Sequence, residues 1–211
     1  MPPTTSRTLV FAKAPRPGAA KTRLIPRLGA EGAAALHARL VEHTLAMARE
    51  AAVGSLELHA TPAEDDFLRR CAARYGAKLV AQCDGDLGQR MRGALANALD
   101  ESECAVLIGT DCPALAAKHL RLAARALREG SDAAFSPTED GGYALIGLAR
   151  RDDRLFEGIA WSTTSVMEET RERLRSLSWR WHELETLWDV DHPADYERLL
   201  ASALLERSGR A

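Results

Sequence analysis

Short apolar runs rich in β-forming residues alternate along this chain with longer segments of helical periodicity. The runs are TLVFA (8–12), SLELHA (55–60), KLVAQ (78–82), CAVLIG (104–109), AAFS (133–136) and YALIGL (143–148). Between them, apolar residues recur at helical spacing over 31–51, 63–75, 87–99 and 116–130. A helix that follows a strand returns the chain to the same end of the sheet, which favours parallel pairing. The alternation therefore predicts an α/β protein with a mostly parallel sheet.

After residue 150 the pattern loosens. A helix is expected to open at Ser162 or Thr163, an aromatic patch, WRWHELETLWDVD, covers 179–191, and a final helix follows Pro193. No stretch resembles a linker, a repeat or a low-complexity segment. We therefore expect one domain over 1–211, which is within the usual size range.

Composition excludes several classes of protein. Hydrophobic residues make up 46% of the chain and charged residues 27%, which is typical of a packed core rather than disorder. The formal net charge of −2 argues against a nucleic-acid partner. The four cysteines form no CxxC pair, the N-terminus lacks the apolar core of a signal peptide, and no run suits a membrane span. We expect a cytoplasmic protein with reduced thiols.

Positive charge gathers in one loop, VFAKAPRPGAAKTRLIPRLG (10–29), directly after the first apolar run. In an open α/β sheet, ligands bind where strands end. Lys13, Lys21 and Arg23 can present cations to phosphate oxygens there, and Gly18 permits close backbone approach. The loop lacks a Walker A motif, because Pro15 and Ala20 stand where its glycines are needed. It predicts a phosphate-bearing ligand; the alternative is a solvated basic loop.

A second signal is VLIGTDCPAL, in which an apolar strand runs directly into Asp111. A carboxylate at a strand end is well placed to hold a divalent cation that is shared with substrate phosphates. The alternative is a helix N-cap for the segment after Pro113. Cys112 is interpreted as a small packed residue rather than a nucleophile.

A third signal is SPTEDGGYALIGL, where Glu139 and Asp140 precede two glycines and a strand. A carboxylate here can bind a hydroxylated acceptor or act as a general base, with Gly141, Gly142 and Tyr143 beside it. The alternative is an ordinary hairpin turn.

The fourth signal is WDVDHPADYERLL. Asp189 and Asp191 alternate along an extended stretch, and we expect them to face opposite sides, so that one of them is available to a site. An N-cap before Pro193 is the alternative for Asp191. The histidines of the helical and strand patterns are interpreted as surface or packed residues, namely His37, His43, His119 and His182.

Taken together, the motifs resemble the nucleotide-diphospho-sugar transferase superfamily. The resemblance rests on FAKAPRPGAAKTRL, GDLGQRM, LIGTDCPAL, DGGYALIGL, GIAWST and WDVDHPADY and runs nearly the full chain. It is closest to a bacterial family of glycosyltransferases linked to arsenosugar biosynthesis, and it extends to the phospholactate and molybdenum-cofactor guanylyltransferases. The resemblance implies a GT-A-like, three-layer α/β/α sandwich.

The resemblance also implies roles for individual residues. Lys13, Lys21 and Arg23 would bind nucleotide phosphates, and Gly88 with Gln89 would lie near the base or ribose. Asp111 would hold Mg²⁺ or Mn²⁺. Asp191 stands where related nucleotidylyltransferases place a second metal contact.

The expected activity is metal-assisted transfer from an activated nucleotide to a small-molecule acceptor. Lys21 and Arg23 would neutralise developing charge and Asp140 would orient or deprotonate the acceptor. Sugar transfer from an NDP-sugar is the leading hypothesis. Nucleotidylyl transfer with release of pyrophosphate is the alternative, and a non-catalytic nucleotide-binding module is an alternative of another class.

Overall fold

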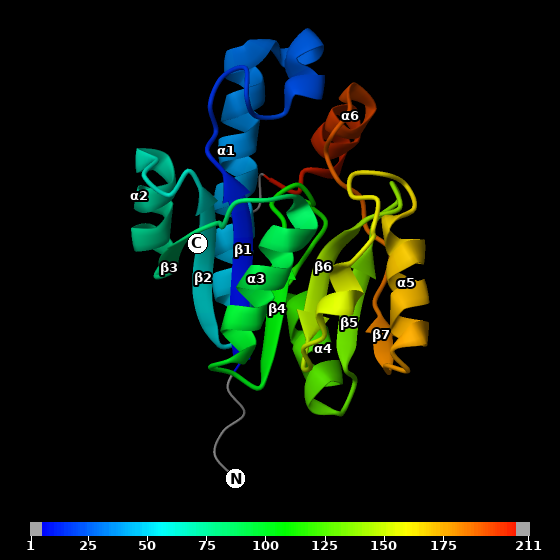
Figure 1. The fold of residues 1–211 in the computed structure, drawn as a ribbon. Helices are drawn as coiled ribbons and strands as arrows, with labels where there is room; N and C mark the ends of the chain where they lie inside the picture. The colour runs from blue at the N-terminus through cyan, green and yellow to red at the C-terminus, as the bar shows by residue number, and fades with distance from the viewer. Residues whose placement is uncertain (1–5, 206–211) are drawn as a thin grey trace.

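Seven strands form one sheet in the computed structural model, which describes residues 6–205. The strand order is β3-β2-β1-β4-β6-β5-β7 (Figure 1). The strands are β1 (Ser6–Lys13), β2 (Ser55–Thr61), β3 (Lys78–Ala81), β4 (Cys104–Ile108), β5 (Ala133–Pro137), β6 (Tyr143–Leu148) and β7 (Trp181–Glu183). Of the described strands, only β6 runs antiparallel to its neighbours. The predicted α/β class with a mostly parallel sheet is confirmed.

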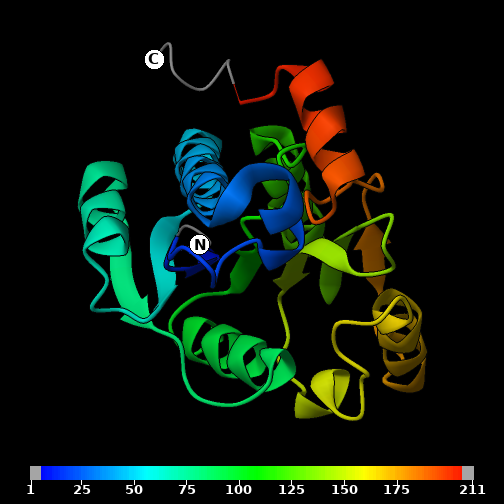
Figure 2. The same ribbon diagram turned by 90° about the horizontal axis from the view of Figure 1, so that it is seen from above.

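Helices cover both faces of the sheet (Figure 2). One face packs against α1 (Ile25–Ala51), α2 (Asp66–Tyr75) and α4 (Ala117–Arg128). The other face packs against α3 (Leu87–Leu99), η2 (Asp153–Phe156) and α5 (Val166–Ser176). The result is the three-layer α/β/α sandwich that the motifs imply.

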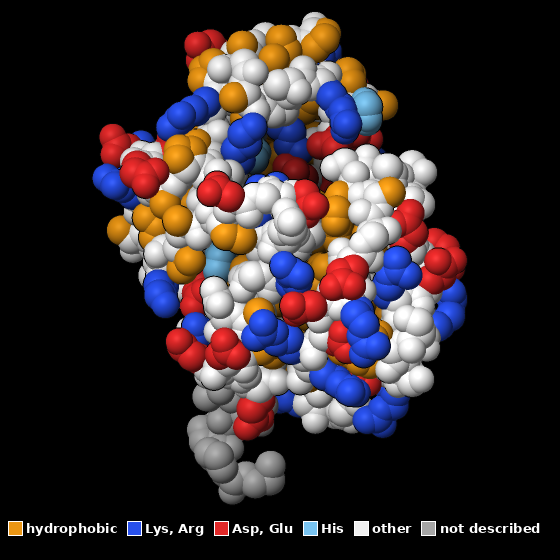
Figure 3. Space-filling model, viewed as in Figure 1, with side chains coloured by type: hydrophobic (Ala, Val, Ile, Leu, Met, Phe, Trp, Pro, Cys, Tyr) orange, Lys and Arg blue, Asp and Glu red, His pale blue; other side chains and the backbone are white. Residues whose placement is uncertain are grey.

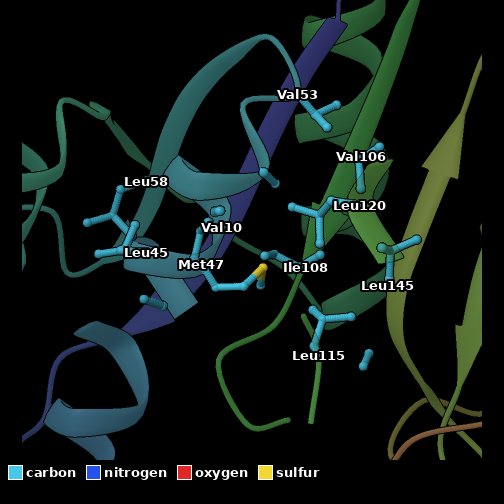
Figure 4. Close-up of a cluster of buried hydrophobic side chains, with 14 of the residues drawn as sticks. Val10, Leu45, Met47, Val53, Leu58, Val106, Ile108, Leu115, Leu120 and Leu145 are labelled. Carbon is cyan, nitrogen blue, oxygen red and sulfur yellow. The ribbon is translucent and has the colours of Figure 1, made fainter. Parts of the chain in front are cut away.

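The core lies between the sheet and each helical layer. Figure 4 shows part of the first cluster, where Val10, Ile108 and Leu145 of the strands meet Leu45 of α1 and Leu120 of α4. All five side chains are fully buried. Burial of each such side chain contributes roughly 1.5–3 kcal/mol, so the central strands are firmly held.

A third, smaller cluster lies above the carboxyl ends of the strands. The 3-10 turn η1 (Thr22–Leu24) and α1 supply Leu24 and Leu40, and these pack with Trp188 and with Leu199 of α6 (Pro193–Ser202). The cluster therefore fixes the basic loop and the C-terminal segment relative to one another.

The predicted element boundaries differ in a few places. The helix expected from Ser162 or Thr163 begins at Val166, with Ser165 as its N-cap, so residues 162–164 form a turn instead. The aromatic patch contains β7, a strand of three residues that we did not predict. Within residues 6–205, no helix is long and apolar enough to cross a membrane.

Candidate functional site

The carboxyl ends of the parallel strands meet at one edge of the sheet, and three cavities open there. An apolar cavity of about 360 Å³ lies against Phe11, Leu87 and Met91. A basic cavity of about 290 Å³ is lined by Lys13, Lys21 and Arg23, and an acidic cavity of about 680 Å³ by Asp140, Asp189 and Asp191, among others. Asp111 lines all three. Figure 3 shows acidic and basic side chains gathered around a hollow in the upper part of the molecule, in the view of Figure 1.

Lys21 occupies the centre of this region. Its backbone is left-handed, with φ 48° and ψ 45°, and its side chain is only 4% exposed. The ammonium lies 2.6 Å from Asp111 Oδ1 and 3.0 Å from Asp191 Oδ1. Burial disfavours the charged ammonium, but the two carboxylates outweigh burial and raise the pKa of Lys21. Lys21 is therefore a permanent cation held between two carboxylates.

Backbone hydrogen bonds bring these carboxylates together from distant parts of the chain. The Val190 amide donates to the Asp111 carbonyl at 2.8 Å, and the Leu187 amide donates to the Pro137 carbonyl at 2.8 Å. The segment 187–191 therefore runs beside the ends of β4 and β5. Arg23 donates to the other oxygen of Asp191 at 3.2 Å.

The expectation that Asp189 and Asp191 face opposite sides is wrong. Both line the acidic cavity, because residues two apart in an extended chain share a face. Neither aspartate suggested as a helix N-cap has that role: His192 is the N-cap of α6, and Ala116 is the N-cap of α4. The side chains of Asp111 and Asp191 are thus available to the site.

Asp189 also lies at the site, although the motifs predict a metal-binding role for Asp111 and Asp191 and not for Asp189. Its Oδ1 is buried and has no hydrogen-bond partner among the residues that the structure describes. Burial, followed by repulsion from Asp111 and Asp140, raises the pKa of Asp189 to about 7. The carboxyl group is thus poised between its neutral and charged forms near neutral pH.

His37 of α1 also reaches this site, although the sequence analysis interpreted it as a surface or packed residue. It lines both the apolar and the basic cavities. Its Nε2 lies 2.9 Å from the Lys13 carbonyl, and its Nδ1 lies 4.0 Å from Asp111 Oδ1. Burial is the main cause that lowers the pKa of His37, so the ring is neutral at pH 7. The helical pattern of α1 gave no signal of this placement.

The structure brings part of the predicted phosphate loop to the cavities. Lys13 lines two of them and donates to the Ala19 carbonyl at 3.0 Å. Gly18 has a φ of 76° in an exposed turn and lines none of the three, so its role is to bend the loop.

Gly88 and Gln89 do not line the cavities as expected for nucleotide contacts. Gln89 forms a capping box with Asp86 at the start of α3, which uses its side chain. A Cβ on Gly88 would lie 2.2 Å from Trp161 Nε1, so this glycine lets the indole approach the helix. Gln82 and Arg90, which the sequence analysis missed, line the apolar cavity instead.

The predicted acceptor segment is divided between structural and cavity-lining roles. Asp140, Gly142 and Tyr143 line the acidic cavity. Gly141 does not; it has a φ of 88°, and a Cβ there would lie 2.0 Å from the Thr164 carbonyl oxygen. The two glycines do form the turn between β5 and β6. Asp140 Oδ1 accepts from Thr138 Oγ1 at 2.5 Å and from the Gly142 amide at 3.1 Å.

No ready-made metal cage exists in the part of the chain that the structure describes. Across residues 6–205, no three His, Cys, Asp or Glu side chains are placed to enclose a metal ion by themselves. Cys112 is 5% exposed, and burial raises the pKa of its thiol to about 12, so it is an inert packed residue.

Comparison with known proteins supports the family and the fold. The family described as "Uncharacterized protein conserved in bacteria (DUF2064)" matches residues 44–163. A search of curated proteins returned no significant match. A candidate nucleotide-diphospho-sugar transferase from Desulfovibrio desulfuricans G20, solved at 1.90 Å, is 29% identical, with a TM-score of 0.82 over 96% of this chain and 97% of that chain.

Two further structures share the fold at lower identity. CMP:2-keto-3-deoxy-manno-octonic acid synthetase, complexed with CTP, is 11% identical with a TM-score of 0.63, over 96% of this chain and 100% of that chain. Glucosyl-3-phosphoglycerate synthase from Mycobacterium tuberculosis, with Mn²⁺, UDP and glucosyl-3-phosphoglycerate, is 14% identical with a TM-score of 0.57, over 98% and 81%. The chain therefore belongs to the DUF2064 family and has the fold of the nucleotide-diphospho-sugar transferases.

Proposed function

We propose that this protein is a metal-dependent glycosyltransferase that moves a sugar from a nucleoside-diphosphate sugar to a small-molecule acceptor. The enzyme class expected from the sequence, a transferase, is confirmed by the structural neighbours. The observation that carries the finer proposal is the position of Lys21, whose ammonium lies between Asp111 and Asp191 where three cavities meet.

The donor set at this point fits a divalent cation. Two carboxylates from separate segments already hold one cationic group, and oxygen ligands are those that Mg²⁺ and Mn²⁺ prefer. Asp111 and Asp191 would hold the ion, and diphosphate oxygens and water would complete its shell. The bound ion would supply charge neutralisation for the departing diphosphate. Glucosyl-3-phosphoglycerate synthase, which has the same fold, carries Mn²⁺ together with UDP.

The three cavities divide the substrates by chemistry. The apolar cavity offers Phe11, Leu87 and Met91 to a base, with Gln82 and Arg90 as polar partners. The basic cavity next to it offers Lys13, Lys21 and Arg23 to phosphates. The acidic cavity, with Asp140 and Tyr143, is suited to hydroxyl groups of the sugar and the acceptor.

In the reaction, the bond between the anomeric carbon and the diphosphate oxygen breaks, and the electron pair leaves with the nucleoside diphosphate. Lys21 and Arg23 stabilise the negative charge on that leaving group. The acceptor oxygen forms the new bond to the anomeric carbon. Asp140, held by Thr138 and the Gly142 amide, receives the acceptor proton.

Nucleotidylyl transfer is the second candidate, because one loop provides three cations to the basic cavity, which also suits a triphosphate. An acceptor phosphate would attack the α-phosphorus, and pyrophosphate would leave. Lys21 and the carboxylates would have the same electrostatic roles. The motifs similar to the arsenosugar-linked glycosyltransferases support a small-molecule acceptor, and that link stays a prediction.

Thermal unfolding in the presence of nucleotides tests the proposal. NTPs, NDPs and NDP-sugars are compared with and without Mg²⁺ or Mn²⁺, since a ligand at 100 times its Kd adds about 2.7 kcal/mol. We expect metal-dependent stabilisation by one NDP-sugar and its NDP, and its loss in Asp111→Asn. Stabilisation by an NTP alone would favour nucleotidylyl transfer, whereas metal-independent binding without turnover would favour a binding module.

A further inference from the structure

Trp161 lies in a segment to which the proposed transfer gives no role. The segment, 157–165, joins η2 to α5 and contains most of the GIAWST motif. Figure 2 shows it between α3 and α5. Four consecutive residues of the segment, 161–164, line the acidic cavity. The motif therefore supplies part of the wall of the cavity that is suited to the sugar and the acceptor.

The indole of Trp161 is held in place by contacts with two other elements. It stacks on Phe156 of η2, with ring centroids 6.4 Å apart and an angle of 26° between the planes. Its Nε1 edge packs against α3 at Gly88, where an added Cβ would lie 2.2 Å from Nε1. The indole is nevertheless only partly buried, and it lines the acidic cavity. An aromatic ring fixed in this way loses little freedom when a ligand packs on it.

The backbone around this indole is also fixed. Glu169 of α5 accepts from the Ala160 amide at 2.8 Å and from the Ser165 hydroxyl at 2.5 Å. The Thr163 hydroxyl donates to the Ala160 carbonyl at 2.6 Å. Ser162 has a φ of 65°, a left-handed conformation that is uncommon outside glycine and persists where neighbouring contacts hold it. The segment is therefore ordered before any ligand binds.

The lining of the acidic cavity combines the two kinds of group that suit a sugar ring. Trp161, Tyr143 and Leu87 offer aromatic and apolar surface, and Asp140 offers carboxylate oxygens. A pyranose ring has an apolar face of C–H groups and a rim of hydroxyl groups. The face can pack on an indole, and the hydroxyl groups can donate to a carboxylate. The base has a separate cavity, whose described lining residues do not include Trp161.

We propose that Trp161 is the platform on which the transferred pyranose ring of the donor stacks, and that it gives the sugar nucleotide its extra affinity over the bare nucleoside diphosphate. This inference rests on the proposed function, whose donor it provides with a sugar subsite. Leu87 and Asp111 line both the apolar and the acidic cavities. A donor with its base in the apolar cavity and its diphosphate beside Asp111 therefore places its sugar in the acidic cavity, where Trp161 forms part of the wall.

The test compares Trp161→Ala with Trp161→Phe and with Trp181→Ala in the full chain. Trp181 is a matched control, because it is also partly exposed and packs against the same core cluster as Trp161. It is not among the described residues that line the three cavities. The ligands are the glucose derivatives of UDP, GDP, ADP, CDP and dTDP, each measured beside its bare diphosphate by isothermal titration calorimetry with saturating Mg²⁺.

The difference between each NDP-glucose and its NDP isolates the contribution of the sugar. For the NDP-glucose that the wild type binds, we expect Trp161→Ala to weaken binding about tenfold or more, and to weaken binding of the corresponding NDP by less than about twofold. Trp161→Phe should recover most of the loss, because it keeps an aromatic surface. Trp181→Ala should bind both ligands as the wild type does.

Saturation-transfer NMR gives a readout that a merely structural role would not change. Irradiation of the aromatic protons of the wild type should transfer saturation to the C–H protons of glucose, and Trp161→Ala should greatly reduce this transfer while transfer to the base remains. Equal affinities of the wild type and Trp161→Ala for NDP-glucose, or an equal loss for NDP-glucose and NDP, would overturn the inference and leave the transferase intact. Failure of the wild type to bind any NDP-glucose would overturn the proposed function together with it.

Discussion

At the scale of single residues, the buried ammonium of Lys21 balances the charge of Asp111 and Asp191 at the site. We predict that Lys21→Met lowers stability by about 1–2 kcal/mol, less than for a fully buried pair because Asp111 is 48% exposed. Saturating Mg²⁺ should restore more stability to this variant than to the wild type, since the ion replaces the ammonium between Asp111 and Asp191. Urea unfolding with and without Mg²⁺ measures both effects.

Lys13→Met is the control for this experiment. Lys13 is exposed, and its ammonium donates to a carbonyl rather than to a carboxylate. The control should unfold at nearly the wild-type urea concentration in either solution. Equal responses of Lys21→Met and wild type to Mg²⁺ would contradict the view that ammonium and metal ion compete for one position.

Asp189 predicts a dependence of stability on pH. Its pKa is raised from 3.8 to about 7 in the folded chain, so between these values the folded state binds more protons than the unfolded state. Stability therefore falls as pH rises from about 4 to about 7, by up to about 4 kcal/mol for this group. Asp189→Asn should flatten this part of the profile and raise stability at pH 8, as measured by urea unfolding at a series of pH values. An unchanged profile would contradict the burial of a charged carboxylate.

Some site residues could be predicted from sequence and others could not. Asp111 follows an apolar, strand-like run, and Asp191 stands two residues before Pro193. Both positions can be recognised in the sequence alone. The position of His37 at the site could not be predicted, because the apolar spacing of its helix indicates only a packed residue. Its ring reaches the site through a long-range contact with the Lys13 carbonyl at the end of β1. Gln89 could have been assigned to a capping box, since Asp86 stands three residues before it.

At the scale of elements, the turn between β5 and β6 forms one wall of the acidic cavity through contact with the turn before α5. We predict that Gly141→Ala destabilises the protein by about 2 kcal/mol or more, because its Cβ would lie 2.0 Å from the Thr164 carbonyl oxygen. Gly18→Ala is the matched control. Its φ is also positive, at 76°, but no atom of the described residues lies within 4 Å of the added carbon, so we expect a loss of about 1 kcal/mol.

Urea unfolding monitored by circular dichroism compares the two variants. A loss no larger for Gly141→Ala than for Gly18→Ala would show that the turn before α5 can move away, and that the wall of the cavity is not fixed by this contact.

The elements that sequence analysis predicted are those with long, strong patterns. The first six strands carry apolar or β-branched runs, and α3 has the bounds that its periodicity indicates. Strand β7 could not be predicted, because it has three residues with polar and aromatic character and, among the described strands, pairs with β5 alone. The late start of α5 follows from tertiary contact, since the Met167 amide donates to the Gly141 carbonyl.

At the scale of the whole molecule, the single domain over 1–211 stays a prediction. One sheet joins the described strands, so we expect one cooperative unfolding transition. Tryptophan fluorescence should coincide with far-ultraviolet circular dichroism, because Trp179 and Trp188 belong to different core clusters. Two separate transitions would indicate two folding units instead.

More of the fold than of the site could be predicted from the sequence. Strand and helix patterns are local, whereas the site depends on contacts between residues far apart in the sequence. Its cavity-lining residues come from six separate segments, within 11–23, 82–91, 107–112, 138–146, 161–166 and 188–195, with His37 and Thr61 added from α1 and β2. The site therefore forms only when these segments have folded together.

The amino-terminal ends of the parallel strands, at the opposite end of the sheet, take no part in the site. The turns that lead into the parallel strands, at 52–54, 76–77, 100–103 and 129–132, contribute no residue to the three cavities. An exposed turn of this kind tolerates inserted chain, because few buried contacts depend on it. The turn between α3 and β4 is therefore a place to insert an affinity tag or a fluorescent label that reports on the enzyme while it keeps its ligands.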